Sequence, residues 1–189
     1  MRPFFALSIA LLLAAAAPAQ LKEVPPRFDI IHNSDLYPQR TPQETLRSVL
    51  TAIAGDRYDY IVAHLLDPDY VDARLNTTQA YYERLAAEQV AATASGAALR
   101  GPELQARVTD IATRMNVRQL ADAMRKKIAD EPDNLKDLRR FARDAEFKDA
   151  GETATATLKD VKDRAVYFKK VGDRWFLENR KEERPRAKE

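Results

Sequence analysis

The sequence contains no cysteine among its 189 residues. A chain without thiols can form no disulfide framework, no thiolate metal site and no thiol nucleophile. One charge sign is also not in large excess, because 31 Lys and Arg side chains stand against 29 Asp and Glu side chains. Nucleic-acid binders usually carry a basic face, so this balance argues against a nucleic-acid partner.

The motifs of several enzyme classes are missing as well. The five glycines form neither common glycine-rich phosphate loop, and no G-x-S-x-G nucleophile elbow occurs. Two histidines and scattered carboxylates give no recognisable set of metal ligands. We therefore expect no cofactor and no bound metal.

The chain does begin with a recognisable pattern. Arg2 precedes a run from Phe4 to Ala16 that is apolar apart from Ser8, and Ala17-Pro18-Ala19 places small residues where signal peptidase reads them. The pattern predicts a secretory signal peptide over residues 1–19, cleaved between Ala19 and Gln20. A membrane anchor is the alternative, but this run is shorter than the roughly 20 residues that span a bilayer. We expect a secreted or periplasmic protein with no integral membrane span after cleavage.

A proline-containing stretch follows and then gives way to helical patterns. Residues 20–40 are predicted to form an extended leader, held to the domain surface by Phe28, Ile30, Ile31 and Tyr37. Thr41-Pro42-Gln43-Glu44 is a helix-start signal, and Gly55 is a stop. A short helix is expected from Asp56 or Asp59 to Leu66, where Asp67-Pro68 ends it.

The middle of the chain is predicted to be helical throughout. A short turn near Tyr70 is expected to precede a helix over 78–94, and further apolar stripes cover 104–115 and 117–128, with a break at Asn116. Glu131-Pro132-Asp133 reads as a stop and a restart before a last helix.

After Arg143 the period of the pattern changes to that of strands. Three turn signals separate four short segments between residues 146 and 177, which predicts an antiparallel meander. We expect an α+β fold in which N-terminal helices cover the sheet of one domain, residues 41–180. The charged tail 181–189 is predicted to be disordered. The face expected to be covered holds Ala154, Ala156, Leu158, Val166, Phe168, Trp175 and Leu177.

Two stretches resemble a known family. The helix start at Thr41 with the Gly55-Asp56-Arg57-Tyr58 turn, and the hairpin Val166–Leu177 with its Gly172-Asp173-Arg174-Trp175 turn, are similar to the nuclear transport factor 2-like (SnoaL-like, cystatin-like) superfamily. The resemblance covers roughly residues 41–70 and 144–180 and implies a cone, in which helices close a curved sheet. The helical segment 76–142 departs from the family pattern.

In a cone-shaped fold, aromatic side chains can line the mouth of a pocket. The candidate pocket residues are Tyr58, His64, Tyr70, Phe168 and Trp175. Ordinary core and rim packing of these rings is the alternative interpretation.

His64 and Asp67 are the weak candidates for catalysis. A His–Asp pair can perform acid–base chemistry when the carboxylate orients the ring, but their spacing alone defines no pocket. Asp67-x-Asp69-x-x-Asp72 lacks the glycine and the closing glutamate of a calcium loop, which favours helix capping.

Three functions remain open at this point. The first is an exported, non-catalytic domain that binds a small apolar molecule or another envelope protein. The second is an isomerase or hydro-lyase acting on a hydrophobic cyclic substrate, as in enzymes of the resembled family. The third is an interaction or homodimerisation module built on the helical segment.

Overall fold

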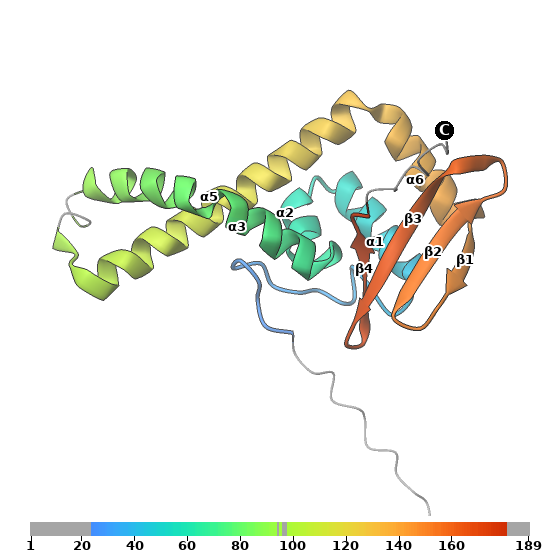
Figure 1. The fold of residues 1–189 in the computed structure, drawn as a ribbon, viewed down its shortest axis with the longest axis horizontal. Helices are drawn as coiled ribbons and strands as arrows, with labels where there is room; N and C mark the ends of the chain where they lie inside the picture. Colours follow the sequence, from blue (N-terminus) through green and yellow to red (C-terminus); the bar gives the residue numbers. More distant parts are fainter. Residues whose placement is uncertain (1–23, 94, 96–97, 181–189) are drawn as a thin grey trace, which may run out of the picture.

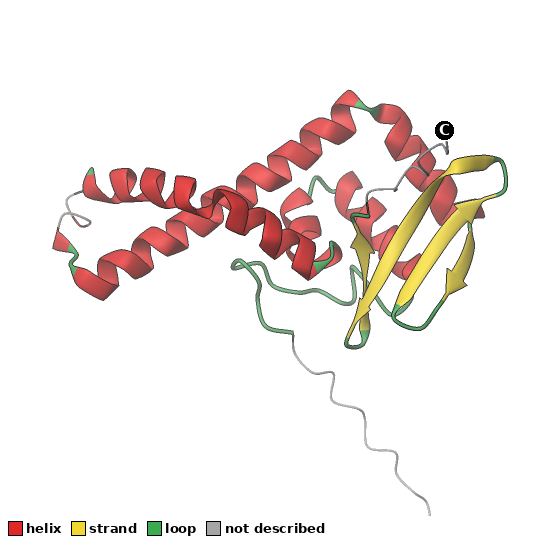
Figure 2. Cartoon of the chain, viewed as in Figure 1, coloured by secondary structure: helices red, strands yellow, loops and turns green. Residues whose placement is uncertain are grey.

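The computed structural model describes residues 24–93, 95 and 98–180. The predicted signal peptide with its Ala19–Gln20 cleavage site and the predicted tail 181–189 lie outside these residues. The fold is α+β, with helices first and an antiparallel sheet last, as expected (Figure 2). Its elements, in chain order, are α1 (Pro42–Ala54), α2 (Tyr58–Tyr60), η1 (Ile61–Leu65), α3 (Pro68–Ala91), α5 (Gly101–Asp130), α6 (Pro132–Asp144), β1 (Glu146–Asp149), β2 (Thr153–Leu158), β3 (Val161–Val171) and β4 (Arg174–Glu178).

The predicted helix start at Thr41 is confirmed. The Glu44 backbone N–H donates to the Thr41 hydroxyl over 3.1 Å, and Pro42 occupies the first turn of α1, where its missing N–H leaves no bond unmade. Gly55 caps the far end of the helix. Leu46 and Val49 are buried, so α1 turns its apolar face toward the core.

The second expected helix is present but changes geometry along its length. Tyr58–Tyr60 is α-helical, and Ile61–Leu65 is a π-helical segment in which every residue is buried. Leu66 then adopts an extended backbone. Asp67, the residue before Pro68, also lies outside the helical region with ψ 120°, as a residue preceding proline usually does.

The middle of the chain forms two long helices, so two predicted interruptions are wrong. α3 runs without a break from Pro68 through Thr78, and α5 runs without a break through Asn116. The reason lies in the Asn116 side chain, which is buried against α3. Its Nδ2 donates to the Leu75 carbonyl over 2.9 Å, and its Oδ1 accepts from the Thr78 hydroxyl over 2.8 Å. With its polar groups satisfied by α3, Asn116 has no need to leave the helix.

Beyond Asn116, α3 and α5 lie side by side and project away from the rest of the molecule (Figure 1). We call this projection, residues 78–93 and 98–115, the helical arm. It has a small core of its own, with Ala86, Val90, Val108 and Ala112 buried between the two helices. Among the residues that the structure describes, no helix is long and apolar enough to cross a bilayer.

The four predicted strands are confirmed as a meander in the order β1-β2-β3-β4, with each neighbouring pair antiparallel. Ala154 stands opposite Phe168, and Phe168 stands opposite Leu177, so these side chains share one face. α1 and α6 cover that face, and Leu46, Phe141 and Ala142 pack on it.

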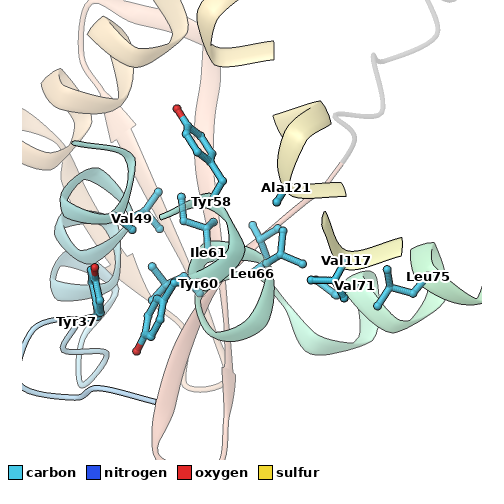
Figure 3. Close-up of a cluster of buried hydrophobic side chains, with 13 residues drawn as sticks. Tyr37, Val49, Tyr58, Tyr60, Ile61, Leu66, Val71, Leu75, Val117 and Ala121 are labelled. Atoms are coloured by element: carbon cyan, nitrogen blue, oxygen red, sulfur yellow. The ribbon is translucent and has the colours of Figure 1, made fainter. Parts of the chain in front are cut away.

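A second cluster of buried side chains joins the helices to each other. It contains residues of α1, α2, η1, α3 and α5, with Tyr37 of the leader at its edge (Figure 3). Phe28 and Ile30 also pack against it, as expected for an anchored leader. Ile31 does not, because its side chain is 75% exposed.

Gln39 connects the leader with two distant elements. Its side-chain amide donates to the His64 carbonyl over 2.9 Å and to the Trp175 carbonyl over 2.7 Å. Its own backbone oxygen accepts from the Trp175 N–H over 2.9 Å. The end of the leader is therefore fixed against both η1 and β4 by a buried polar side chain.

Candidate functional site

A cavity of about 470 Å³ lies between α1, α5, α6 and the β3–β4 hairpin. Apolar residues of all these elements line it, and Val166 and Leu177 bring part of the apolar sheet face to its wall. The helices contribute Val49, Ile53, Ile61, Met124, Ile128, Leu138 and Phe141, and Leu66 contributes from the extended segment after η1. This volume falls within the range of small-molecule sites, roughly 300–1,000 Å³.

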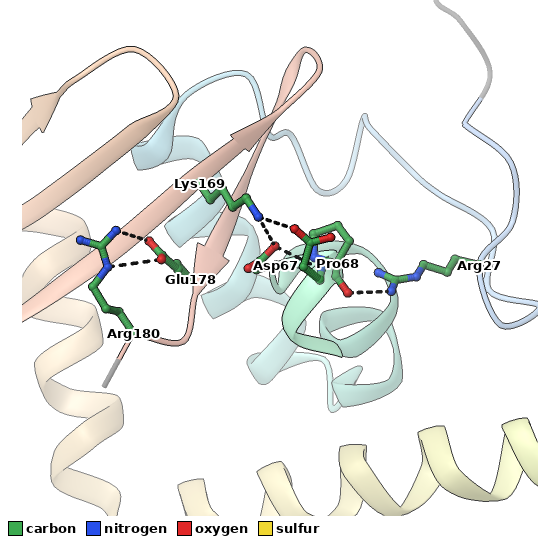
Figure 4. Close-up of polar contacts among 7 residues, drawn as sticks. Arg27, Asp67, Pro68, Lys169, Glu178 and Arg180 are labelled. Carbon is green, nitrogen blue, oxygen red and sulfur yellow. Dashed lines mark hydrogen bonds and ion pairs between the residues drawn. The ribbon is translucent and has the colours of Figure 1, made fainter. Parts of the chain in front are cut away.

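Charged residues also line this cavity, and most of them are paired with one another. Arg164 forms an ion pair with Asp137, and Arg180 forms one with Glu178 at 3.0 Å. The Glu178–Arg180 pair closes the end of β4 (Figure 4). Lys127 is exposed and has no ion pair with any described residue. The cavity therefore combines apolar walls with an ionic rim.

The five residues expected from sequence to line a pocket lie elsewhere. Phe168 and Trp175 are buried in the cluster between the sheet, α1 and α6. Tyr58 and Tyr70 belong to the helix cluster, where Arg125 also stacks over the Tyr58 ring at 5.3 Å. The structure thus divides these rings between two packed clusters, and none of the five is among the residues that line the cavity.

His64 is buried on η1, with 1% of its surface exposed. Its Nε2 lies 2.7 Å from the Ile30 carbonyl oxygen, which accepts a hydrogen bond from the neutral ring. Burial lowers the pKa of His64 to about 4, although the bond to Ile30 acts in the opposite direction. The rings of His32 and Tyr60 pack around it, with centroids 5.3 and 4.9 Å away. Through these contacts, His64 connects η1 to the leader.

Asp67 caps the start of α3 rather than orienting His64. Its carboxylate accepts from the Asp69 N–H over 3.3 Å and from the Lys169 ammonium over 3.4 Å (Figure 4). Lys169 also pairs with Asp69, and that contact lowers the pKa of the Asp69 carboxyl. Arg27 of the leader binds Asp72 and the Pro68 carbonyl.

The aspartates that resemble part of a calcium loop are therefore paired with the side chains of Lys169 and Arg27. Within residues 24–93, 95 and 98–180, no group of three or more His, Asp or Glu side chains is arranged to hold a metal ion.

The sequence indicates the helical residues of the cavity only as members of apolar stripes on predicted helices. Met124 and Ile128 belong to the predicted stripe over 117–128, and Leu138 belongs to the last predicted helix. A stripe shows which face of a helix is apolar, but whether that face is filled or left open depends on the helix opposite. The one signal specific to the site was the expectation that Val166 and Leu177 share the covered sheet face.

Comparisons of this chain with protein-family models, with curated proteins and with solved structures gave no match. The function of this chain is therefore inferred from the cavity itself.

Proposed function

We propose that the protein is an exported, non-catalytic domain that binds a small apolar molecule in the cavity between α1, α5, α6 and the β3–β4 hairpin. The observation that carries this proposal is an open volume of about 470 Å³ that apolar side chains of α1, η1, α5, α6, β3 and β4 line. Apolar surface that stays in contact with water is unfavourable, and a ligand that covers it gains free energy.

The rim of the cavity favours a binding role over a catalytic one. Asp137 and Glu178, the carboxylates of the lining, are both held in ion pairs with arginines. A general base must be within hydrogen-bond reach of the proton that it removes. His64, the catalytic candidate, is instead occupied by the Ile30 carbonyl.

The proposed export depends on the N-terminal pattern of Arg2, the apolar run and Ala17-Pro18-Ala19. We also propose that the chain is a divergent member of the nuclear transport factor 2-like superfamily. Helices that precede a four-stranded meander support this assignment, and the cavity would then correspond to the inside of the cone. The helical arm would be an addition to that fold.

Binding can be tested with N-phenyl-1-naphthylamine, a neutral apolar dye that fluoresces when it leaves water. The purified protein should raise its fluorescence saturably, and Met124→Trp should abolish most of the increase because the larger side chain occupies the cavity. Met115→Trp is a matched control, since Met115 lies on the same helix, is also partly buried and faces the arm. Equal binding by the protein and Met124→Trp would refute the site.

A second function, self-association through the helical arm, is favoured by one observation. Tyr81 on the outer surface of the arm is 53% exposed, and its ring packs against that of Tyr82 at 5.1 Å. Exposed aromatic side chains are frequent anchors of protein interfaces. Light scattering over a range of concentrations tests this: a mass twice that of the monomer, reduced by Tyr81→Ser, supports the dimer, whereas a constant monomer mass rejects it.

A further inference from the structure

A second hollow lies at the opposite end of β4 from the apolar cavity. It has a volume of about 410 Å³ and is enclosed by the leader and by the turn between β3 and β4. Its apolar lining residues are Val24, Pro26, Ile31 and Pro38. Its polar lining residues are His32, Ser34, Gln39, Arg40, Asp173 and Arg174.

Arg174 is the unusual member of this group. Its guanidinium lies over the Phe176 ring, with 5.0 Å between the central carbon and the ring centroid. Its Nη1 is shielded from solvent and has no hydrogen-bond partner in the part of the chain that the structure describes. Buried polar groups nearly always have a partner, and a charged donor without one is especially costly. Part of the hydrogen-bonding capacity of this guanidinium is therefore unused within the described residues.

The charges around the hollow indicate which kind of ligand it suits. The lining includes two arginines, Arg40 and Arg174, and one acidic residue, Asp173. Asp173 is exposed, and the Gln39 amide is already bound to backbone carbonyls. Burial also lowers the pKa of the Arg174 guanidinium, which means that its charge is poorly compensated. The local excess of positive charge is complementary to an anion.

From this geometry we infer that the hollow is a binding site for a small carboxylate with an apolar body, held by Arg174 and Arg40 at its charged end and by Val24, Pro26 and Ile31 along its chain. A guanidinium offers two parallel N–H donors to the two oxygens of a carboxylate. The apolar lining residues give the body of such a ligand a surface to cover. This site is separate from the cavity of the proposed function and does not depend on it.

Sodium hexanoate and hexanol form a matched pair of probes, because they share the apolar chain and differ in the carboxylate. Titration of the purified protein, followed by NMR, should show hexanoate shifting the Arg174 side-chain signal and the backbone amides of Ile31 and Gln39. Hexanoate should bind at least about tenfold more tightly than hexanol, as expected for charge-assisted hydrogen bonds. Equal affinities of the two probes would overturn the proposal.

Substitutions locate the binding and separate it from the apolar cavity. Arg174→Gln should weaken hexanoate binding about tenfold or more, whereas Arg139→Gln removes the same charge from an exposed position on α6 and should leave binding unchanged. Arg40 is exposed, so Arg40→Gln gives a second test in a folded protein if Arg174→Gln does not fold, with an expected loss of several-fold. Met124→Trp should leave the affinity for hexanoate unchanged. Unchanged affinity in the arginine variants, or loss in Met124→Trp, would show that the carboxylate does not bind here.

Discussion

The buried imidazole of His64 makes the stability of this protein depend on pH in a defined direction. Removal from water lowers the pKa of the ring from 6.5 to about 4, and the neighbouring charges of His32, Arg174 and Arg27 act in the same direction. The bond to the Ile30 carbonyl opposes this shift without cancelling it. In the unfolded chain the ring is hydrated, and its pKa returns to the ordinary value near 6.5.

These two pKa values fix the sign and the size of the effect. Above pH 6.5 His64 is neutral in both states and adds no pH dependence. Between pH 6.5 and 4 the unfolded chain binds more protons than the folded one, so the free energy of unfolding falls as the pH falls. Relative to pH 8, His64 alone should cost about 1 kcal/mol at pH 5.5 and about 3 kcal/mol at pH 4.5.

Urea unfolding at pH 8, 5.5 and 4.5 measures this contribution when the protein is compared with His64→Gln. A glutamine amide can still donate to the Ile30 carbonyl but does not titrate, so the variant should lose most of the decline in stability. His32→Gln is the control, because His32 is only partly buried and should account for a smaller share. Two results would refute this assignment. One is a free energy of unfolding that falls as steeply with pH in His64→Gln as in the unsubstituted protein. The other is an NMR titration of the folded state that gives His64 a pKa near 6.5.

Three further substitutions test the packing. Gln39→Met should lower the free energy of unfolding by about 1–3 kcal/mol in urea, because it leaves the buried His64 carbonyl without its donor, whereas Gln119→Met at an exposed site of α5 should change it little. Phe141→Ala should lower the free energy of unfolding by about 3–5 kcal/mol in the same assay, because it leaves a cavity beneath the sheet. Phe147→Ala, at a partly buried site, should lower it less, and an equal loss in the two variants would contradict this packing. Val108→Asp should accelerate hydrogen exchange in the helical arm while the strands keep their protection, since the arm has a separate core; equal loss of protection in the sheet would refute that separation.

Most of the secondary structure could be predicted because its signals are local. The Thr41 cap and the Pro132 restart are signals made by neighbours in sequence, as are the turns around Gly151 and Gly172, where both glycines adopt positive φ. The errors arose where a distant contact overrides a local preference. Asparagine is a poor helix former, yet Asn116 stays helical because Leu75 and Thr78 satisfy its amide.

The candidate sites could not be predicted to the same extent. The sequence cannot show whether Tyr58, Tyr70, Phe168 and Trp175 line a pocket. Aromatic side chains suit both a core and a pocket, and residue type does not distinguish the two. The cavity instead depends on the direction in which α6 leaves α5 after Glu131-Pro132. Arg174 gave no signal at all, because an arginine in a turn is ordinary until the leader covers it.

One helix, α5, connects the helical arm with the apolar cavity, the two features that were hardest to predict from the sequence. α5 packs in the helical arm through Val108 and Ala112, in the helix cluster through Val117 and Ala121, and at the cavity through Met124 and Ile128. A single uninterrupted helix transmits position along its length, since each turn is hydrogen-bonded to the next. Asn116 fixes the angle of this helix against α3 at the point where the arm meets the body. The wall of the cavity is therefore positioned partly by contacts in a part of the molecule that the cavity does not touch.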